Sequence, residues 1–273
     1  MVDYRHPLPD FDDPPVIETL LAVQFAPLES LSTQHFGLYW AKIRSSYPHC
    51  ETKPPLSPAI EEFGVQPRTK TKIGIEFISD PSVRCWFIDE SSTRLIQVQR
   101  DRFIQNWRKT KAEDVYPRYK SLKPDFLSEW QRFCEFLEQE RLGIPDVNQC
   151  EVTYVNHIEP GKGWHSYGEV HKVISHWSGG PPGDFLPEPE IVRLNTMFLM
   201  PDKRGRLHIV MQPAIRQVDA KEVLQLNLTA RGTPKSSTVD DILDWFDLGH
   251  EWIVKGFTDF TTREMHTVWR RKV

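Results

Sequence analysis

The stretch Leu224-Gln225-Leu226-Asn227-Leu228-Thr229-Ala230-Arg231 alternates strictly between apolar and polar residues. Successive side chains of a strand point to opposite faces of a sheet, so this stretch predicts a strand with one apolar and one polar face. The same alternation sets Gln97 and Gln99 against Ile96 and Val98 in an earlier segment. Patterns of this kind are typical of an antiparallel sheet that helices cover on one face only.

The chain around this strand predicts a definite order of elements in its second half. Apolar alternation indicates strands, apolar residues spaced by three and four indicate helices, and glycines and prolines mark the connections. The predicted elements after residue 145 are a strand at 151–158, a helix at 167–177, strands at 191–200, 207–217 and 222–231, a helix at 239–257, and a last short helix that carries Trp269.

The first half of the chain predicts a similar order. Its elements are a strand at 16–25, a helix around 36–43, a proline-rich loop at about 51–70, strands at 72–78, 84–89, 94–99 and 103–109, and a helix at 124–142. The repeat predicts an α+β fold of two β-α-β-β-β-α units, at residues 1–145 and 146–273, packed as one globule. The units form either one strongly twisted sheet or two sheets related by a pseudo-dyad. This arrangement resembles the TATA-binding-protein and helix-grip folds.

The bulk composition is that of an ordinary globular protein. Of the 273 residues, 39% are hydrophobic and 26% are charged, and the net charge is −4, so no overall positive field indicates nucleic acid or an anionic membrane. The four cysteines include no C-x-x-C pair, and the chain shows no signal-peptide pattern. It also lacks an apolar run of about 20 residues that would span a bilayer. We therefore expect a cytoplasmic protein without membrane contact.

Motifs for catalysis, metal binding or cofactor binding are missing from the sequence. No G-x-S-x-G, H-E-x-x-H or glycine-rich phosphate loop occurs. The carboxylates of Glu61 and Glu62 are adjacent and diverge in an extended chain, so no acid–base geometry follows from them. His250 follows Phe246 by four residues on the inner stripe of a predicted helix, which favours a hydrogen-bonded core histidine over a metal ligand. The sequence therefore identifies no catalytic, metal or cofactor site and favours a non-enzymatic role.

The polar face of the predicted sheet is the first candidate binding surface. It carries amides, hydroxyls and an arginine, which are groups that hydrogen-bond a partner. The alternative is a plainly solvated face, which one-sided antiparallel sheets commonly have. The candidate residues on this face are Gln97, Gln99, Gln225, Asn227 and Arg231.

A basic and aromatic segment at residues 94–123 is the second candidate. Nine basic residues stand against three acidic ones, and aromatic residues lie among them. Cations neutralise phosphates while aromatic rings stack on bases, so the mixture fits a path for single-stranded nucleic acid. An edge strand with solvated cations explains it equally well. The candidate residues are Arg100, Arg102, Trp107, Arg108 and Tyr119.

Several segments spread over the chain carry a resemblance to one family. They are Pro14-Pro15-Val16-Ile17-Glu18, Gln97-Val98-Gln99-Arg100-Asp101-Arg102-Phe103, Asn106-Trp107-Arg108, Tyr116-Pro117-Arg118-Tyr119 and Tyr154-Val155-Asn156-His157-Ile158. Together they resemble a sporadically distributed family of uncharacterised bacterial proteins, over essentially the whole chain. The resemblance implies no activity, substrate or cofactor. The patchy distribution of the family implies a mobile-element, defence or toxin–antitoxin locus.

These observations support three hypotheses of different kinds. The leading one is a non-enzymatic cytoplasmic module that holds another protein on the polar sheet face or on the proline-rich loops. The second is a nucleic-acid-binding module that uses the segment 94–123. The third is a small-ligand pocket under the curved sheet, as helix-grip folds can enclose. The sequence leaves the partner and the oligomeric state open.

Overall fold

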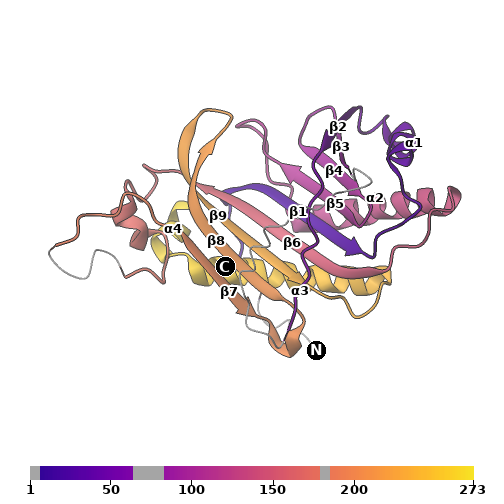
Figure 1. Ribbon diagram of the computed structural model, residues 1–273. Coiled ribbons are helices and arrows are strands. Elements are labelled where there is room, and N and C mark those ends of the chain that lie inside the picture. The colour runs from indigo at the N-terminus through magenta and orange to yellow at the C-terminus, as the bar shows by residue number, and fades with distance from the viewer. Residues whose placement is uncertain (1–6, 64–82, 179–184) are drawn as a thin grey trace.

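The computed structural model describes residues 7–63, 83–178 and 185–273. Its strands form one open sheet of nine strands in which every neighbouring pair is antiparallel (Figure 1). The strands are β1 (Val16–Phe25), β2 (His49–Lys53), β3 (Arg84–Ile88), β4 (Arg94–Gln99), β5 (Arg102–Arg108), β6 (Val147–Ile158), β7 (Leu194–Leu199), β8 (Arg206–Arg216) and β9 (Lys221–Gly232).

The two halves of the chain meet at the centre of this sheet. The strand order is β2-β3-β4-β5-β1-β6-β9-β8-β7, so β1 pairs with β6, and each half extends the sheet outward from that pair. Of the two arrangements that the sequence leaves open, the single continuous sheet is therefore the one that forms. The α+β class and the antiparallel sheet are confirmed.

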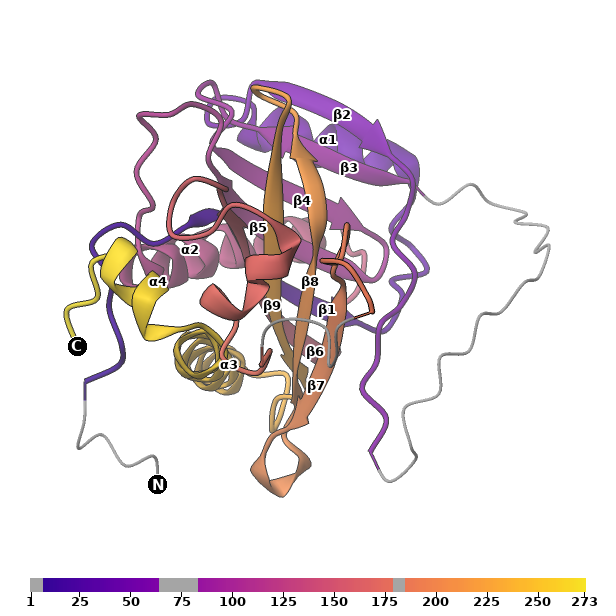
Figure 2. The ribbon, with the colours of Figure 1, turned by 90° about the vertical axis from the view of Figure 1, so that its left-hand side faces the viewer.

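Helices cover one face of the sheet. They are α1 (Thr33–Ile43), α2 (Tyr119–Gln139), α3 (Val239–Phe260) and α4 (Arg263–Val268), with short 3₁₀ turns η1 (Tyr167–Lys172) and η2 (Pro201–Lys203) in the connections. Figure 2 shows α3 and α4 on one side of the sheet and the chain that follows β2 on the other. No helix among the described residues is long and apolar enough to cross a membrane.

The core lies between the helices and the apolar sheet face. The four apolar positions of the opening stretch, from Leu224 to Ala230, are all 0% exposed, as the alternation predicts. The stripe Phe126, Trp130, Phe133 and Leu137 of α2 is likewise buried. Burial of this apolar surface is the main stabilising contribution to the fold.

Some predicted elements are wrong in their bounds. Residues 51–53 of the predicted loop at 51–70 belong to strand β2. This strand pairs with β3, although its side chains are exposed or half-buried. The predicted helix at 167–177 is only the turn η1, because Ile174 already forms a β-bridge to Thr261. Helix α2 begins at Tyr119, five residues before the predicted start. The ring of Tyr119 stacks on His250. The predicted strand at 72–78 lies outside the described residues.

Candidate functional site

The proline-rich segment after β2 lies across the polar face of the sheet. We call residues 54–63, Pro-Pro-Leu-Ser-Pro-Ala-Ile-Glu-Glu-Phe, the crossing segment. It runs on the face opposite the helices (Figure 2). Its contacts reach β4, β5, β1, β6, β8 and β9 in turn. Two surfaces that the sequence proposes separately, the polar sheet face and a proline-rich loop, are therefore bound to each other.

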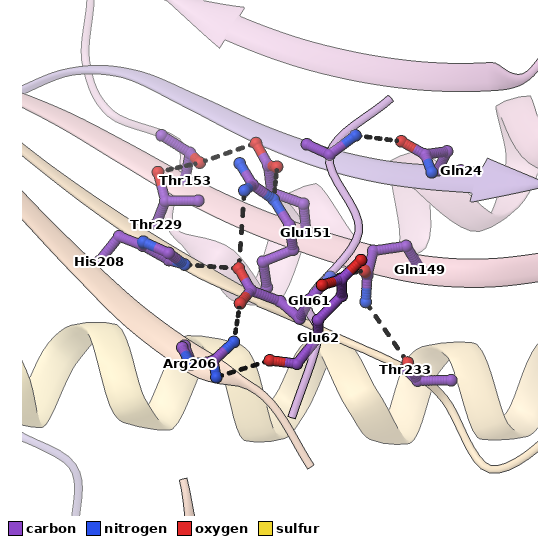
Figure 3. Close-up of polar contacts among 12 residues, drawn as sticks. Gln24, Glu61, Glu62, Gln149, Glu151, Thr153, Arg206, His208, Thr229 and Thr233 are labelled. Carbon is purple, nitrogen blue, oxygen red and sulfur yellow. Dashed lines mark hydrogen bonds and ion pairs between the residues drawn. The ribbon is translucent and has the colours of Figure 1, made fainter. Parts of the chain in front are cut away.

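Three glutamines, on β4, β1 and β6, hold the main chain of the crossing segment. Gln99 of β4 accepts from the Leu56 amide at 3.0 Å and donates to the carbonyl of the same residue at 3.0 Å. Gln24 of β1 accepts from the Ala59 amide at 3.0 Å. Gln149 of β6 accepts from the Glu61 amide at 2.7 Å (Figure 3).

These glutamines form one row because of the sheet register. Gln24 lies opposite Gln149 on one side and opposite Arg102 on the other, and Arg102 lies opposite Gln99. Residues directly opposite each other share a face, so the four side chains follow one line across β4, β5, β1 and β6. Arg102 completes the row by donating to the Gln24 amide oxygen and, at 3.1 Å, to the carbonyl of Ser57.

The amides of the row are buried and therefore need partners. Gln24, Gln99 and Gln149 are 6%, 4% and 2% exposed. A buried amide without a hydrogen bond lowers the free energy of unfolding by roughly 1–3 kcal/mol, judged from protein mutational data. The main chain of the crossing segment supplies these partners. The contacts do not depend on the side chains of the segment, so another extended chain could supply them equally well.

The far end of the crossing segment is held by charge. The carboxylate of Glu61 lies 2.5 Å from Arg206 Nη1 and 2.6 Å from His208 Nε2, and Arg231 Nη1 is 3.7 Å away. Figure 3 shows Glu61 between His208 and Arg206, with the Glu62 carbonyl accepting a further bond from Arg206 at 2.7 Å. Burial alone would raise the pKa of Glu61, but hydrogen bonds from His208 and Arg206 outweigh it and lower the pKa. Glu61 is thus held as an anion.

A cavity of about 190 Å³ lies where Leu56 and Ala59 of the crossing segment face the sheet. Its wall includes a chain of hydrogen bonds in which Gln97 donates to Asn106 at 2.8 Å and Asn106 donates to Glu18 at 2.6 Å. Burial raises the pKa of Glu18, although the Asn106 bond and the nearby Arg108 charge oppose it. This chain of hydrogen bonds and the glutamine row line the same cavity on the polar face.

The residues predicted on the polar face are found there. Gln97 belongs to the hydrogen-bond chain with Asn106, and Gln99 belongs to the glutamine row. Arg231 joins Glu61 to Glu151, whose Oε2 lies 2.7 Å from Arg231 Nε. Gln225 lies farther along the face and contacts His157 Nε2 at 3.3 Å. The Asn227 amide oxygen is buried without a hydrogen-bond partner among the described residues.

The residues predicted for a nucleic-acid path are not brought together on one surface. Trp107 is 6% exposed and belongs to the core on the helix side, where its ring contacts Tyr116. Tyr119 also lies on that side, with its hydroxyl on Asp247 at 2.8 Å. Base stacking needs an exposed ring face, which Trp107 does not offer. Arg102 is committed to the glutamine row.

The remaining two arginines of that prediction have local partners. Arg100 Nη2 donates to Glu29 Oε2 at 2.7 Å. Arg108 Nε donates to the Ser92 carbonyl at 2.9 Å. Each of these contacts joins the end of a strand to a neighbouring turn or loop. Strands β4 and β5 each have a neighbour on both sides, so the interpretation of this segment as an edge strand with solvated cations is wrong.

His250 is a hydrogen-bonded core histidine, as its helical spacing predicts. Tyr116 donates to Tyr154 at 2.8 Å, and the Tyr154 hydroxyl lies 3.0 Å from His250 Nδ1. The ring of Tyr119 stacks on the imidazole with centroids 3.9 Å apart. Burial lowers the pKa of His250 to about 4, so the ring is neutral at pH 7 and accepts from Tyr154. No cluster of potential metal ligands is found in the described part of the chain.

Several residues of the site escape prediction from the sequence. Gln24 and Gln149 alternate with buried neighbours such as Val23 and Cys150, so the rule that identifies Gln97 and Gln99 could have found them. Arg206 and His208 alternate with Leu207 in the same way. Glu61 carries no such signal, because its partners lie on distant strands.

Comparison with known proteins gives no relative for this chain. No protein-family model, no curated protein and no solved structure matches it. The resemblance to a sporadically distributed bacterial family and the likeness to the TATA-binding-protein and helix-grip folds therefore stay predictions.

Proposed function

We propose that this protein is a non-enzymatic cytoplasmic interaction module that binds an extended, proline-rich segment of a partner protein across the polar sheet face. In the absence of the partner, the crossing segment occupies this face as an internal ligand. The observation that carries the proposal is the row of buried glutamines, which bind the main chain at Leu56, Ala59 and Glu61.

The contacts of the row are of the kind that peptide-binding surfaces use. Hydrogen bonds to main-chain groups give affinity for any chain of the right shape, while separate pockets give specificity. The prolines Pro54, Pro55 and Pro58 restrict the crossing segment to extended conformations, which lowers the entropy lost on binding. A partner with prolines at similar places would have the same advantage.

The crossing segment can leave the face without opening the core. All ten of its residues are described: six are exposed and the other four are half-buried, and among these four the side chain of Glu61 is 6% exposed. Ile60 is 58% exposed, so most of its large aliphatic side chain is in contact with solvent. The segment is held by hydrogen bonds, whose net contribution is about 0.5–1.5 kcal/mol each, and by the bonds to the Glu61 carboxylate, of about 1.5–3 kcal/mol each. A segment held in this way, without apolar packing in the core, opens at a lower free-energy cost than the whole fold.

The test is binding of a peptide in trans. A receptor with Ala59→Pro and Glu61→Gln, which we call the released receptor, lacks two features of the natural protein. They are the amide hydrogen donated to Gln24 and the negative charge held by the cage of Arg206, His208 and Arg231. A fluorescent peptide of residues 53–63 in the natural sequence is titrated against it and against the natural protein by anisotropy. We expect the released receptor to bind at least about tenfold more tightly, because an internal ligand competes at an effective concentration in the millimolar range.

Two variants on the same sheet face serve as controls. In the released receptor, Gln99→Ala removes two hydrogen bonds to the peptide and should weaken binding. Gln225→Ala should leave it unchanged, since Gln225 contacts His157 and not the crossing segment. Hydrogen exchange of residues 54–63 reports whether the segment has left the face. Continued protection there, or exposure without peptide binding at about 1 mM, would contradict the proposal.

A further inference from the structure

The two adjacent carboxylates of the crossing segment are treated differently by the sheet. The Glu61 side chain is 6% exposed, and both of its oxygens contact cationic or imidazole groups of β8 and β9. Glu62 is exposed and is contacted through its main-chain carbonyl, which accepts from Arg206 Nη2 at 2.7 Å. Position 61 is therefore the place where the sheet contacts a side chain of the segment by charge.

The cage around Glu61 is built to hold an anion. Arg206 donates through both terminal nitrogens, one to the Glu61 carboxylate at 2.5 Å and one to the Glu62 carbonyl. The Arg206 guanidinium also lies over the ring of Phe63, with 4.8 Å to the centroid. A carboxylate only accepts hydrogen bonds, so His208 Nε2 carries the hydrogen in its 2.6 Å contact. Charge-assisted bonds of this type are roughly twice as strong as neutral ones.

The charge balance of the cage favours a carboxylate over a phosphate. Arg206 and Arg231 supply two positive charges, and Glu151 neutralises one of them through its 2.7 Å bond to Arg231. The remaining groups are Arg206 and the His208 imidazole, each of which donates to one oxygen of a single carboxylate. A phosphate would bring a charge of about −1.5 to −2 next to Glu151.

We propose that Arg206, His208 and Arg231 form the specificity pocket of the module and select a partner segment with a carboxylate side chain at the position of Glu61. This inference rests on the proposed function and deepens it. The ligand is then an extended chain whose main chain is held at three points by glutamines and whose acidic residue stands at the last of these points. Its class is a proline-rich acidic peptide.

The test compares peptides that differ at one residue. The peptide of residues 53–63 is prepared in its natural sequence, with Glu61→Gln, with Glu62→Gln, and with phosphoserine in place of Glu61. Each is titrated against the released receptor. We expect Glu61→Gln to weaken binding about tenfold or more and Glu62→Gln to have little effect, because the Glu62 carboxylate is exposed. The phosphoserine peptide should bind no more tightly than the natural one.

A second receptor shows whether the pocket causes the selectivity. With Arg206→Gln added to the released receptor, the natural and Glu61→Gln peptides should bind with similar affinity. Hydrogen exchange of β8 confirms that the variant keeps its sheet.

The outcomes separate the two proposals. Equal binding of the natural and Glu61→Gln peptides to the released receptor would overturn the carboxylate pocket and leave the peptide-binding face intact. Tighter binding of phosphoserine would overturn the choice of carboxylate. Failure of every peptide to bind would contradict the proposed function itself.

Discussion

The two faces of one strand, β5, differ in what holds their side chains. Phe103 is 0% exposed and contacts the rings of Phe126, Trp130 and Phe133 on the helix side. Its neighbour Arg102 points to the opposite face and binds a carbonyl of the crossing segment. The first contact is made by apolar surface packed against three rings of α2, and the second by a directional bond to main chain.

This difference separates the face whose contacts maintain the fold from the face whose contacts can be replaced by water or by another chain. Close-packed side chains lose many contacts at once when they separate, so the helix side opens only with the whole molecule. Hydrogen bonds to main-chain groups can be replaced by water or by another chain at a small net cost. The helix side therefore stabilises the sheet, and the polar side is the one that we propose binds a partner.

The largest expected effect on stability comes from a substitution on the helix side of β5. Phe103→Ala should lower the free energy of unfolding by about 3–5 kcal/mol, because it removes a fully buried ring and leaves a cavity among three aromatic rings. Gln99→Ala, one strand away on the polar face, should cost about 1 kcal/mol. Urea unfolding monitored by circular dichroism measures both. Similar losses for the two variants would show that the faces do not differ in this way.

An intermediate effect concerns His250, which contacts Tyr119 and Tyr154 on the helix side of the sheet. His250 has its pKa lowered to about 4 by burial, whereas an unperturbed histidine in the unfolded chain titrates near 6.5. The unfolded state therefore binds a proton first, and stability is lost as the pH falls from about 6.5 toward 4, by up to about 3 kcal/mol. The measurement is urea unfolding of the natural protein and of His250→Gln at pH 7 and pH 4.5.

The sign of the His250 effect distinguishes it from general acid unfolding. His250→Gln should lose less stability on acidification than the natural protein, since glutamine does not titrate. The exposed His171, whose ring contacts the Gly168 carbonyl, provides a matched control, and His171→Gln should keep the natural pH dependence. Parallel pH profiles for all three proteins would contradict the role assigned to His250.

The smallest expected effect on stability concerns Glu18, on the polar side of the sheet. Burial raises the pKa of Glu18, so the folded protein is favoured when this carboxyl is protonated, and that contribution is lost as the pH rises through the folded pKa. Glu18→Gln keeps an acceptor for Asn106 and removes the charge. The variant should be more stable than the natural protein at pH 7, by about 1 kcal/mol or less. The advantage should disappear below pH 4, and its persistence there would contradict the assignment.

Much of the fold follows from local pattern, and much of the site does not. The alternation at 224–231 and the stripe of α2 each reflect which side chains face the core, so they predict the strand and the helix. Strand β2 has no such stripe, because its side chains are exposed or half-buried, and it is missed. The three glutamine contacts join residues 35 to 88 positions apart in the chain, a distance over which no pattern is visible.

The sequence by itself determined that this protein is a one-sided antiparallel sheet with helices, since hydrophobic periodicity is a local property of the chain. It also placed Gln97, Gln99, Gln225, Asn227 and Arg231 on the polar face. Only the tertiary structure decided that β1 and β6 join the halves into one sheet and that residues 54–63 lie across it. The reason is physical: strand order and the pairing of a carboxylate with three distant cationic or imidazole groups depend on which segments meet in space, which the local pattern of hydrophobicity does not encode.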